Sequence, residues 1–314
     1  MLKYCVIGSL NYDLIINCPI FPKMGQTIIG DSLSEIPGGK GGNQAMAIAK
    51  LGGNVSFLGN LGNDNYGKFY LKELNREGIN TSNIIINNDN RTGIGICSVD
   101  YKGNSQIIVI PGANYVYDSS TLDRWENSIK ESDVFLLQNE INSKLLYKVI
   151  DKIREYPNKI IILDASPAMD FDESIYSKID YLTCSKGEAK TITSITIQSR
   201  ESAKECASWF LSKGLSHLII YIDKEGLYYF DKTQSLYSPT YKNIVYVDST
   251  GAGDSFNGAF ALSLEKKFSI REALWFSQAV AAISITKTGA QTALPSFEEA
   301  MELYTNTIPS FSEL

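Results

Sequence analysis

Residues 248–259 read DSTGAGDSFNGA, a glycine-rich turn followed by small residues of helical character, with a carboxylate at the junction. Gly251, Ala252 and Gly253 carry almost no side chain, so their N–H groups can converge on an anion while the helix dipole adds positive charge. Asp254 beside such an anion can accept the proton of a group that attacks a phosphate. The pattern predicts phosphoryl transfer to an alcohol with Asp254 as the base. The alternative is that Asp254 only caps a helix.

A second glycine-rich stretch, PGGKGGNQA, occupies residues 37–45. Four glycines in five positions (38–42) allow a ligand to approach the backbone closely. The helix expected after them places Lys40 and Asn43 near its N-terminus. The stretch matches neither the Walker loop nor the dinucleotide fingerprint. We interpret it as a binding loop for another kind of ligand, and a purely structural turn is the alternative.

Asn11 and Asp13 follow the first expected strand. In an extended chain they point to the same side, where an amide and a carboxylate suit adjacent hydroxyl groups. Paired hydroxyls are typical of a sugar. The same residues also favour a simple turn.

The composition excludes several classes of function. The net charge is −6 and the 29 Lys and Arg residues are scattered, which argues against nucleic acid as a partner. Five widely spaced cysteines without a C-x-x-C pair indicate reduced thiols, a cytoplasmic protein and no structural zinc. His217 is the single histidine, which argues against a Ser-His-Asp triad and His-ligated metals. No apolar run approaches the roughly 18 residues of a membrane span, so no membrane partner is expected.

The elements that must position these residues alternate between short β-branched runs and longer amphipathic stretches. This alternation predicts βαβ units and a parallel sheet, with ligands at the carboxyl ends of the strands. The expected strands cover residues 4–7, 55–58, 134–137, 160–163, 181–183 and 218–222. The expected helices cover residues 44–51, 64–76, 143–154, 201–213, 254–264 and 270–286.

Two segments, about 14–37 and 91–111, lack helical periodicity. We expect strands and turns there, with a hairpin around residues 101–104. They predict a small β-sheet lid inserted in a single domain that spans residues 1–314, and an exposed lid edge would favour a homodimer. Two long surface loops are the alternative.

The segments at 38–45 and 248–259 together resemble the two signatures of the PfkB family of sugar kinases, and the chain is most similar to its ribokinase members. Other segments fall in the family's order: GSLNYD at 8–13, GND at 62–64, GAN at 112–114, QNE at 138–140 and KTGAQ at 287–291. The resemblance implies a ribokinase-like, doubly wound, mostly parallel α/β sheet flanked by helices. It also implies ATP-dependent phosphorylation of the primary hydroxyl of a pentose, with D-ribose first.

The resemblance also implies a role for individual residues. Asp254 would be the catalytic base, with Gly251, Ala252 and Gly253 as the anion hole. The sugar would be bound by Asn11, Asp13, Gly39, Lys40, Asn43 and Glu140. ATP would lie against Ser185, Glu188, Tyr221, Asp223, Gly226 and Gly253, with Mg²⁺ held by Glu188 through water. A monovalent cation, usually K⁺, would lie at Asp248, Thr250, Ser284, Lys287 and Gly289.

The nucleotide half departs from the family pattern. Of the usual Asn-x-x-Glu element, residues 185–188 keep only Glu188, because Ser185 replaces the Asn. Asp223 stands where a Gly is expected, and it either faces the ATP phosphates or is a solvated turn residue. Three alternatives therefore remain: a nucleoside kinase, a deoxyribose kinase, and a sugar-binding regulator with weakened phosphoryl transfer.

Overall fold

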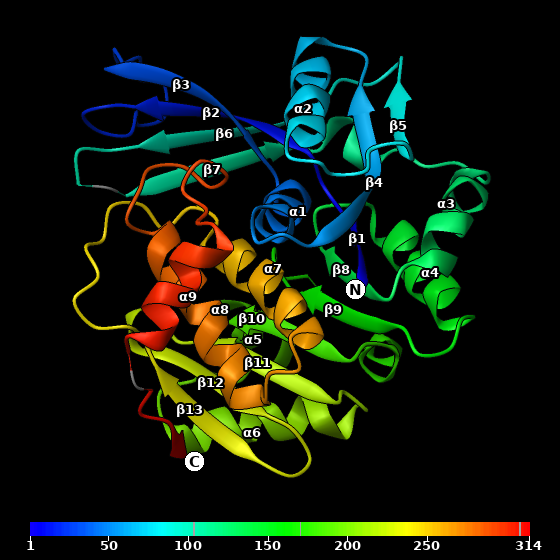
Figure 1. Cartoon of the computed structure of the whole chain (residues 1–314). Helices are drawn as coiled ribbons and strands as arrows, with labels where there is room; N and C mark the ends of the chain where they lie inside the picture. The colour runs from blue at the N-terminus through cyan, green and yellow to red at the C-terminus, as the bar shows by residue number, and fades with distance from the viewer. Residues whose placement is uncertain (103, 170, 308) are drawn as a thin grey trace.

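The computed structural model describes residues 1–314 except Gly103, Asp170 and Ile308. Its central feature is a ten-stranded sheet in the order β14-β13-β12-β11-β10-β9-β8-β1-β4-β5 (Figure 1). Neighbouring strands from β5 to β11 run parallel, and β11 to β14 pair antiparallel. The strands are β1 (Lys3–Ile7), β4 (Asn54–Gly62), β5 (Ile84–Asn87), β8 (Val134–Gln138), β9 (Ile160–Asp164), β10 (Tyr181–Ser185), β11 (His217–Tyr221), β12 (Gly226–Phe230), β13 (Ser235–Pro239) and β14 (Ser312–Glu313). The predicted mostly parallel α/β sheet is confirmed.

Helices cover both faces of this sheet, which gives three layers. One face packs against α3 (Thr121–Glu131), α4 (Ser143–Arg154), η2 (Glu173–Lys178), α5 (Lys186–Thr193) and α6 (Arg200–Ser212). The other face packs against α1 (Lys40–Lys50), α2 (Asn65–Arg76), α7 (Ala252–Glu265), α8 (Ile270–Ser284) and α9 (Phe297–Thr305). Two further short turns are η1 (Gly112–Tyr115) and η3 (Asp223–Glu225).

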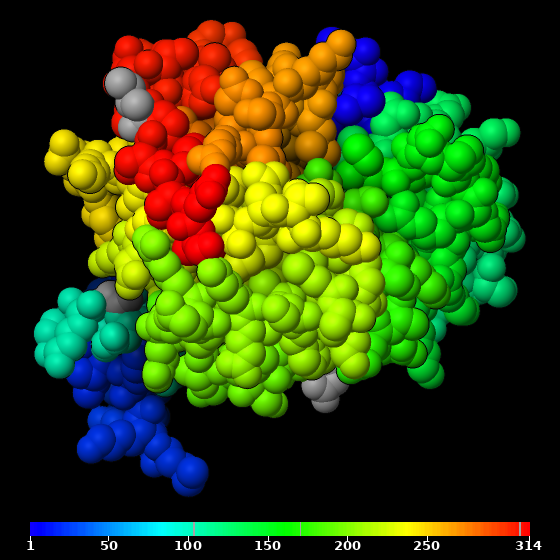
Figure 2. Space-filling model, turned by 90° about the horizontal axis from the view of Figure 1, so that it is seen from below, coloured from blue at the N-terminus to red at the C-terminus, as the bar shows by residue number. Residues whose placement is uncertain are grey.

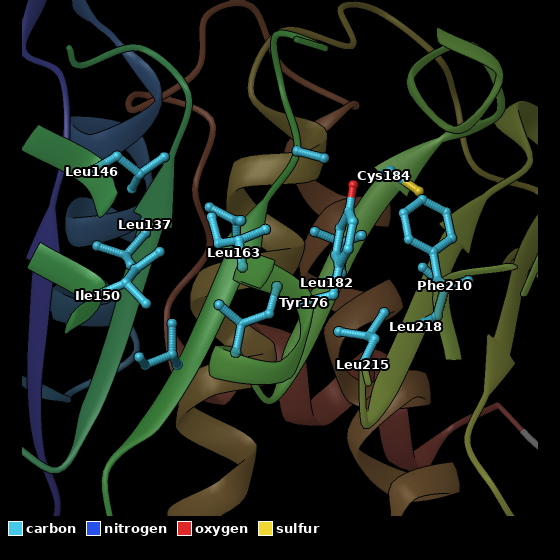
Figure 3. Packing of buried hydrophobic residues seen from close by; sticks show 14 of the residues in the cluster. Leu137, Leu146, Ile150, Leu163, Tyr176, Leu182, Cys184, Phe210, Leu215 and Leu218 are labelled. Carbon is cyan, nitrogen blue, oxygen red and sulfur yellow. The ribbon is translucent and has the colours of Figure 1, made fainter. Parts of the chain in front are cut away.

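Strand β8 shows why these runs form buried parallel strands. Phe135 and Leu137 pack on the first face, whereas Val134 and Leu136 pack on the second. Figure 3 shows Leu137 beside Leu146 of α4. A strand buried on both faces must be apolar at every position, and the chain meets this condition with continuous Val, Ile and Leu runs.

A separate four-stranded sheet, in the order β3-β2-β6-β7, forms the lid. Its strands are β2 (Asn11–Asn17), β3 (Ser32–Gly38), β6 (Gly93–Val99) and β7 (Ser105–Ile110). Figure 2 shows these blue and blue-green segments projecting beyond the body of the molecule. The small β-sheet predicted from the aperiodic segments is confirmed. The expected turn at Gly103 lies outside the described residues.

Several elements differ from those expected. The first helix begins at Lys40 rather than at residue 44, although glycine disfavours helices. The tertiary structure requires those glycines, because a Cβ on Gly41 would lie 2.7 Å from the Ser9 nitrogen and one on Gly42 would meet the Tyr70 hydroxyl. The expected elements also lacked β5, the antiparallel strands β12 to β14, and the helices α3, α5 and α9. Strand β5 and the helices α5 and α9 are short, and the polar α3 is held by its two buried apolar residues, Trp125 and Ile129.

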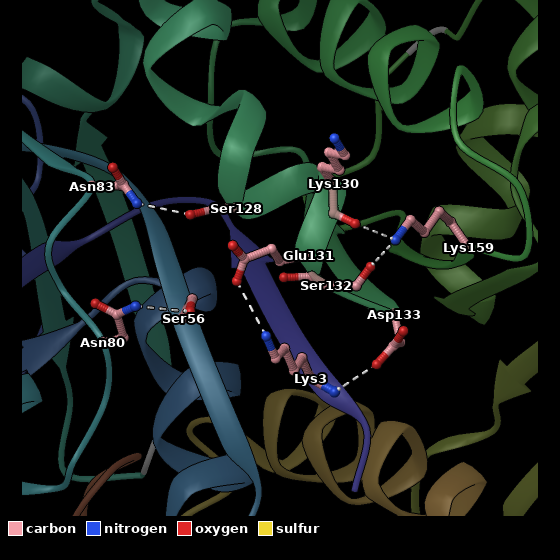
Figure 4. A network of polar contacts seen from close by, with 10 residues as sticks. All are labelled: Lys3, Ser56, Asn80, Asn83, Ser128, Lys130, Glu131, Ser132, Asp133 and Lys159. Carbon is pink, nitrogen blue, oxygen red and sulfur yellow. Dashed lines mark hydrogen bonds and ion pairs between the residues drawn. The ribbon is translucent and has the colours of Figure 1, made fainter.

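Polar contacts fasten the amino ends of the central strands (Figure 4). The Lys3 backbone N–H donates to the Asp133 carboxylate at 2.9 Å, and the Lys159 ammonium donates to the Ser132 carbonyl at 2.5 Å. The predicted site residues lie at the opposite, carboxyl ends, as expected for this architecture. Among the described residues, no helix combines the length and the apolar character needed to cross a membrane.

Candidate active site

Asp254 lies in the first turn of α7 and is 5% exposed. The preceding Gly251 has a φ of 75°, a left-handed conformation that glycine adopts without strain. A Cβ on Gly251 would lie 2.7 Å from the Ala290 Cβ, so the close packing also requires glycine. The sequence therefore folds here into a tight turn that delivers the Asp254 carboxylate directly into the interior.

The turn that was predicted to bind an anion differs in one detail from the prediction. The Ala252 N–H donates to the Ser249 carbonyl at 3.1 Å, so it is not free to contact an anion in this conformation. The first N–H groups of a helix have no partner within the helix, and Gly253 and Asp254 occupy such positions in α7. Of the three predicted donors, the Ala252 N–H is therefore occupied in this conformation, whereas the Gly253 N–H lies with that of Asp254 at the free end of the helix.

Both oxygens of the Asp254 carboxylate accept hydrogen bonds from amide side chains of α1. Asn43 Nδ2 donates to Oδ2 at 2.9 Å, and Gln44 Nε2 donates to Oδ1 at 3.1 Å. Burial raises the pKa of Asp254, and the Lys40 charge and these two amides oppose that rise. A carboxylate held in place with a raised pKa is a suitable proton acceptor.

Lys40 is half-buried at the start of α1 and faces several carboxylates. Burial acts to lower its pKa, but Asp254, Asp164, Glu140 and Glu188 raise it above the ordinary value. The Lys40 backbone N–H donates to Glu140 Oε2 at 3.0 Å, and Ser9 Oγ donates to the same oxygen at 2.5 Å. Lys40 therefore stays cationic among groups that would otherwise repel one another.

The predicted sugar-binding residues of the lid lie at the start of β2. Asn11 Oδ1 accepts a hydrogen bond from Asn114 Nδ2 at 2.8 Å. The Asp13 carboxylate lies against two glycines, since a Cβ on Gly38 or Gly95 would overlap its oxygens. Burial, with Glu140 and Asp254 nearby, raises the pKa of Asp13 to about 7. Gly39, with a φ of 83°, leads from the lid into α1.

Sequence reasoning missed a second group of buried polar residues around Asp254. Its members are Ser9, Gln44, Gln138, Asp164 and Gln291. Asp164 is the last residue of β9 and accepts a hydrogen bond from Gln44 Nε2 at 3.1 Å. A carboxylate that ends a buried parallel strand is the signal that would have identified it.

The contribution of Asp164 to the stability of the protein should fall as the pH rises. Burial raises its folded pKa to about 7 from 3.8, so the folded state binds the proton more tightly than the unfolded chain. The stability that Asp164 contributes is fully present below about pH 4 and is lost as the pH rises through 7. Urea unfolding at pH 5 and pH 8 should show a smaller pH dependence for Asp164→Asn than for the wild type. Equal pH dependence in both proteins would contradict the raised pKa, and the exposed Asp123→Asn serves as control.

The expected nucleotide residues lie at the ends of β10 and β11. Ser185 and Glu188 form a capping box at the start of α5, in which Glu188 Oε2 accepts from the Ser185 N–H at 2.6 Å. Tyr221 Oη donates to Asn257 Oδ1 of α7 at 3.2 Å, which places the end of β11 beside the first turns of α7. Gly226, with a φ of 132°, begins β12 after the η3 turn.

Asp223 is paired with a cation. Its carboxylate lies 3.0 Å from Lys186 Nζ, and its side chain is 72% exposed. Its φ of 53° is in the left-handed region, where glycine would be unstrained. The Asp223 carboxylate, with burial opposing, raises the pKa of Lys186. Asp223 is thus an exposed turn residue with a partner, and Lys186 compensates its charge.

Asp248 joins two segments that are distant in sequence. Its Oδ2 accepts from the Gly289 N–H at 2.8 Å, and its Oδ1 accepts from the Thr250 N–H at 2.9 Å. Ser284 Oγ lies 3.1 Å from Ser255 Oγ in α7. The 248–250 and 284–289 segments therefore lie side by side next to the N-terminus of α7, and Lys287 lies in the second segment.

The model of the pfkB family of carbohydrate kinases matches residues 1–296. The chain belongs to this family. The carbohydrate kinase is 33% identical to a ribokinase from Haemophilus influenzae over 297 residues, which cover 95% of this chain and 96% of that protein. It is 28% identical to a deoxyribokinase from Salmonella typhimurium over 297 residues, which cover 95% and 97% of the two chains.

The solved structure of Arabidopsis thaliana ribokinase, complexed with ribose and ATP, matches this carbohydrate kinase with a TM-score of 0.88. The two proteins are 25% identical, and the match covers 97% of this chain and 99% of the other. The resemblance predicted from the two glycine-rich motifs is confirmed, and so is the ribokinase-like fold.

Proposed function

We propose that this carbohydrate kinase transfers the γ-phosphoryl group of ATP to the primary hydroxyl of a pentose, D-ribose first. The observation that supports this most strongly is the position of Asp254. It is a buried carboxylate in the first turn of α7, joined by hydrogen bonds to Asn43 and Gln44 of the glycine-rich helix. The Asp254 carboxylate belongs to the 248–259 motif and also contacts the glycine-rich 37–45 motif. It therefore joins the two motifs that the proposed chemistry requires.

In this proposal, Asp254 accepts the proton of the sugar hydroxyl as that oxygen attacks the phosphorus in line. The transition state of phosphoryl transfer is loose, so positioning and charge stabilisation contribute more than the base. The N–H groups at the start of α7 would stabilise the transferred group. Asn11, Asp13, Lys40, Asn43 and Glu140 would hold the sugar hydroxyls, and the lid would exclude water.

An ADP-release assay tests the proposal. The purified protein should release ADP with ATP, Mg²⁺ and ribose faster than with deoxyribose, fructose or adenosine. A preference for deoxyribose would instead support the alternative suggested by the deoxyribokinase relative. Absence of turnover with every sugar, accompanied by sugar binding, would support the alternative of a regulator. The buried Asp254 argues against a regulator, because a protein that only binds sugar has no use for the base.

A divalent cation fits the proposed nucleotide site only in part. Among the described residues, no three His, Cys, Asp or Glu side chains converge to hold a metal. Glu188 uses Oε2 in the capping box, which leaves Oε1 for a metal-bound water. This suits Mg²⁺, which keeps most of its waters and relies on substrate phosphates. When bound with ATP, Mg²⁺ would neutralise phosphate charge.

We propose a monovalent-cation site between the 248–250 and 284–289 segments, involving Asp248, Thr250, Ser284, Lys287 and Gly289. The structure fits this proposal in one respect. Asp248 binds the Thr250 and Gly289 N–H groups and holds both segments next to α7. The backbone carbonyls of these segments are the ligands that K⁺ would use, and the bound cation would rigidify the anion-binding turn.

Activity should therefore rise several-fold when KCl replaces choline chloride at constant ionic strength. Constant ionic strength separates specific binding from general screening. Initial rates of ADP release in the two salts measure the effect. Equal rates in choline and potassium would refute the cation site.

Asp223→Gly should lower the KM for ATP about tenfold. The substitution removes an anion near the expected phosphate site and frees Lys186, whose ammonium can then contact a phosphate. The KM for ribose should not change. The double variant Asp223→Gly with Lys186→Met should lose the gain, because the cation is then absent. An unchanged ATP KM in the single variant would show that the pair does not face the nucleotide.

We also propose that the protein forms a homodimer through the lid. All residues of the lid's edge strand β7 are exposed, including Ile107 and Ile108 at 64% and 65%. An exposed apolar strand at a sheet edge invites pairing with another strand. A second copy of the lid would cover this strand, which a monomer leaves open.

A further inference from the structure

The carboxylate of Asp254 is the end point of two chains of buried amides. Asn43, which donates to Oδ2, accepts a hydrogen bond from Gln291 Nε2 at 3.0 Å. Gln44, which donates to Oδ1, accepts from Gln138 Nε2 at 2.7 Å. Each carboxylate oxygen thus has its own support, and the orientation of the group is fixed from both sides.

The Gln44 chain has a feature that the Asn43 chain lacks. Gln44 Nε2 lies 3.1 Å from Asp254 Oδ1 and also 3.1 Å from Asp164 Oδ2. A primary amide carries two N–H hydrogens, and here each is committed to a different carboxylate. Gln44, Asp164 and Asp254 are each no more than 5% exposed. Water cannot easily replace any of these bonds, so a rotation of Gln44 would leave buried groups unpaired.

We propose that Gln44 and Asp164 form a positioning pair for the base. Asp164 fixes the Gln44 amide, and Gln44 fixes Oδ1 of Asp254, so that the remaining lone pairs of the carboxylate face the sugar hydroxyl. This inference rests on the proposed function. Neither residue touches the substrate in this arrangement, and both act through Asp254.

The pair also acts electrostatically on the base. Charged groups face the two carboxylates from several elements: Lys40 of α1, Asp13 of β2, Glu140 after β8 and Glu188 of α5. The Gln44 N–H stabilises the ionised form of Asp254 and lowers its pKa. The Asp164 charge repels the ionised form of Asp254, so each of these two carboxylates raises the pKa of the other. Gln44 and Asp164 therefore act on the base in opposite directions.

This opposition gives a sharp test. The pH dependence of kcat/KM for ribose is measured with saturating Mg-ATP from pH 5 to 9 for the wild type, Gln44→Met and Asp164→Asn. Gln44→Met should lower kcat about tenfold to 100-fold and move the acidic limb to higher pH, because a hydrogen bond to the ionised base is lost. Asp164→Asn should move the acidic limb to lower pH, because a repelling charge is removed.

The matched control is Gln278→Met. Gln278 is another buried glutamine (8% exposed, against 1% for Gln44), but its Nε2 donates to Ser238 Oγ rather than to a carboxylate. This variant should keep the wild-type pH profile even if its thermal unfolding midpoint falls. A pH shift in the control would show that any buried amide loss alters the profile, and would overturn the inference.

Three further outcomes are decisive. If Gln44→Met and Asp164→Asn fold and their acidic limbs coincide with that of the wild type, the positioning pair is refuted while the proposed function stands. If Gln44→Met does not fold, the inference is tested by Asp164→Asn alone. It stands if the acidic limb of that variant moves to lower pH and is refuted if the limb does not move or moves to higher pH. If the wild type turns over no sugar, the proposed function fails and the inference fails with it.

Discussion

Asp254→Asn should lower kcat for ribose by about 10² to 10⁴, the usual range for loss of a general base. The carboxylate is the acceptor in the proposed proton transfer, and an amide cannot take that role. Both oxygens of Asp254 accept hydrogen bonds from amides. The NH₂ group introduced by the substitution would therefore point at the N–H donor of Asn43 or Gln44, and no hydrogen bond could form between two donors. We therefore also expect a lower thermal unfolding midpoint. Steady-state ADP release measures turnover, and calorimetry measures ribose binding, which should change little.

The control for this experiment is Asp123→Asn, which removes an exposed carboxylate of α3. It should leave turnover and stability unchanged. If Asp254→Asn binds ribose and turns over within a few-fold of the wild type, Asp254 is not the base. A loss of ribose binding equal to the loss of turnover would instead assign Asp254 to the sugar site alone.

Lys40→Met should lower turnover by about 10² at pH 7, at the lower end of the range for acid–base catalysis. Lys40 opposes the burial that raises the pKa of Asp254, so without it the base is protonated at higher pH. The acidic limb of the pH profile should therefore move to higher pH, and activity should partly recover as the pH is raised to 9. Rates of ADP release across this range measure the shift.

The control is Lys204→Met, which removes an exposed charge on α6. Its pH profile should match that of the wild type. An unshifted limb in Lys40→Met would mean that Lys40 does not face the base. A shift to lower pH would reverse the sign of the proposed interaction and would contradict the charge arrangement directly.

The sequence by itself determined the family and the central sheet, and it also led to the proposal of Asp254 as the base. Continuous Val, Ile and Leu runs are required by strands buried on both faces, so the central strands were predictable from residue type alone. Asp254 was predictable because the turn at Gly251 needs a left-handed conformation that glycine supplies locally. Lys40 and Asn43 were predictable for a similar reason, since they lie within a few residues of the glycines that mark their loop.

Only the tertiary structure decided which partners these residues have. Gln44, Asp164 and Gln138 lie far apart in the chain, and no local pattern marks a buried amide as a ligand of a carboxylate. The pairing of Asp223 with Lys186 was equally hidden, because it joins the ends of two neighbouring strands. The helical start at Lys40 overrides glycine's own preference, since close packing against Ser9 and Tyr70 leaves no room for a side chain. Local conformation is set by residue type, whereas hydrogen-bond partners and pKa values depend on which elements the fold brings together.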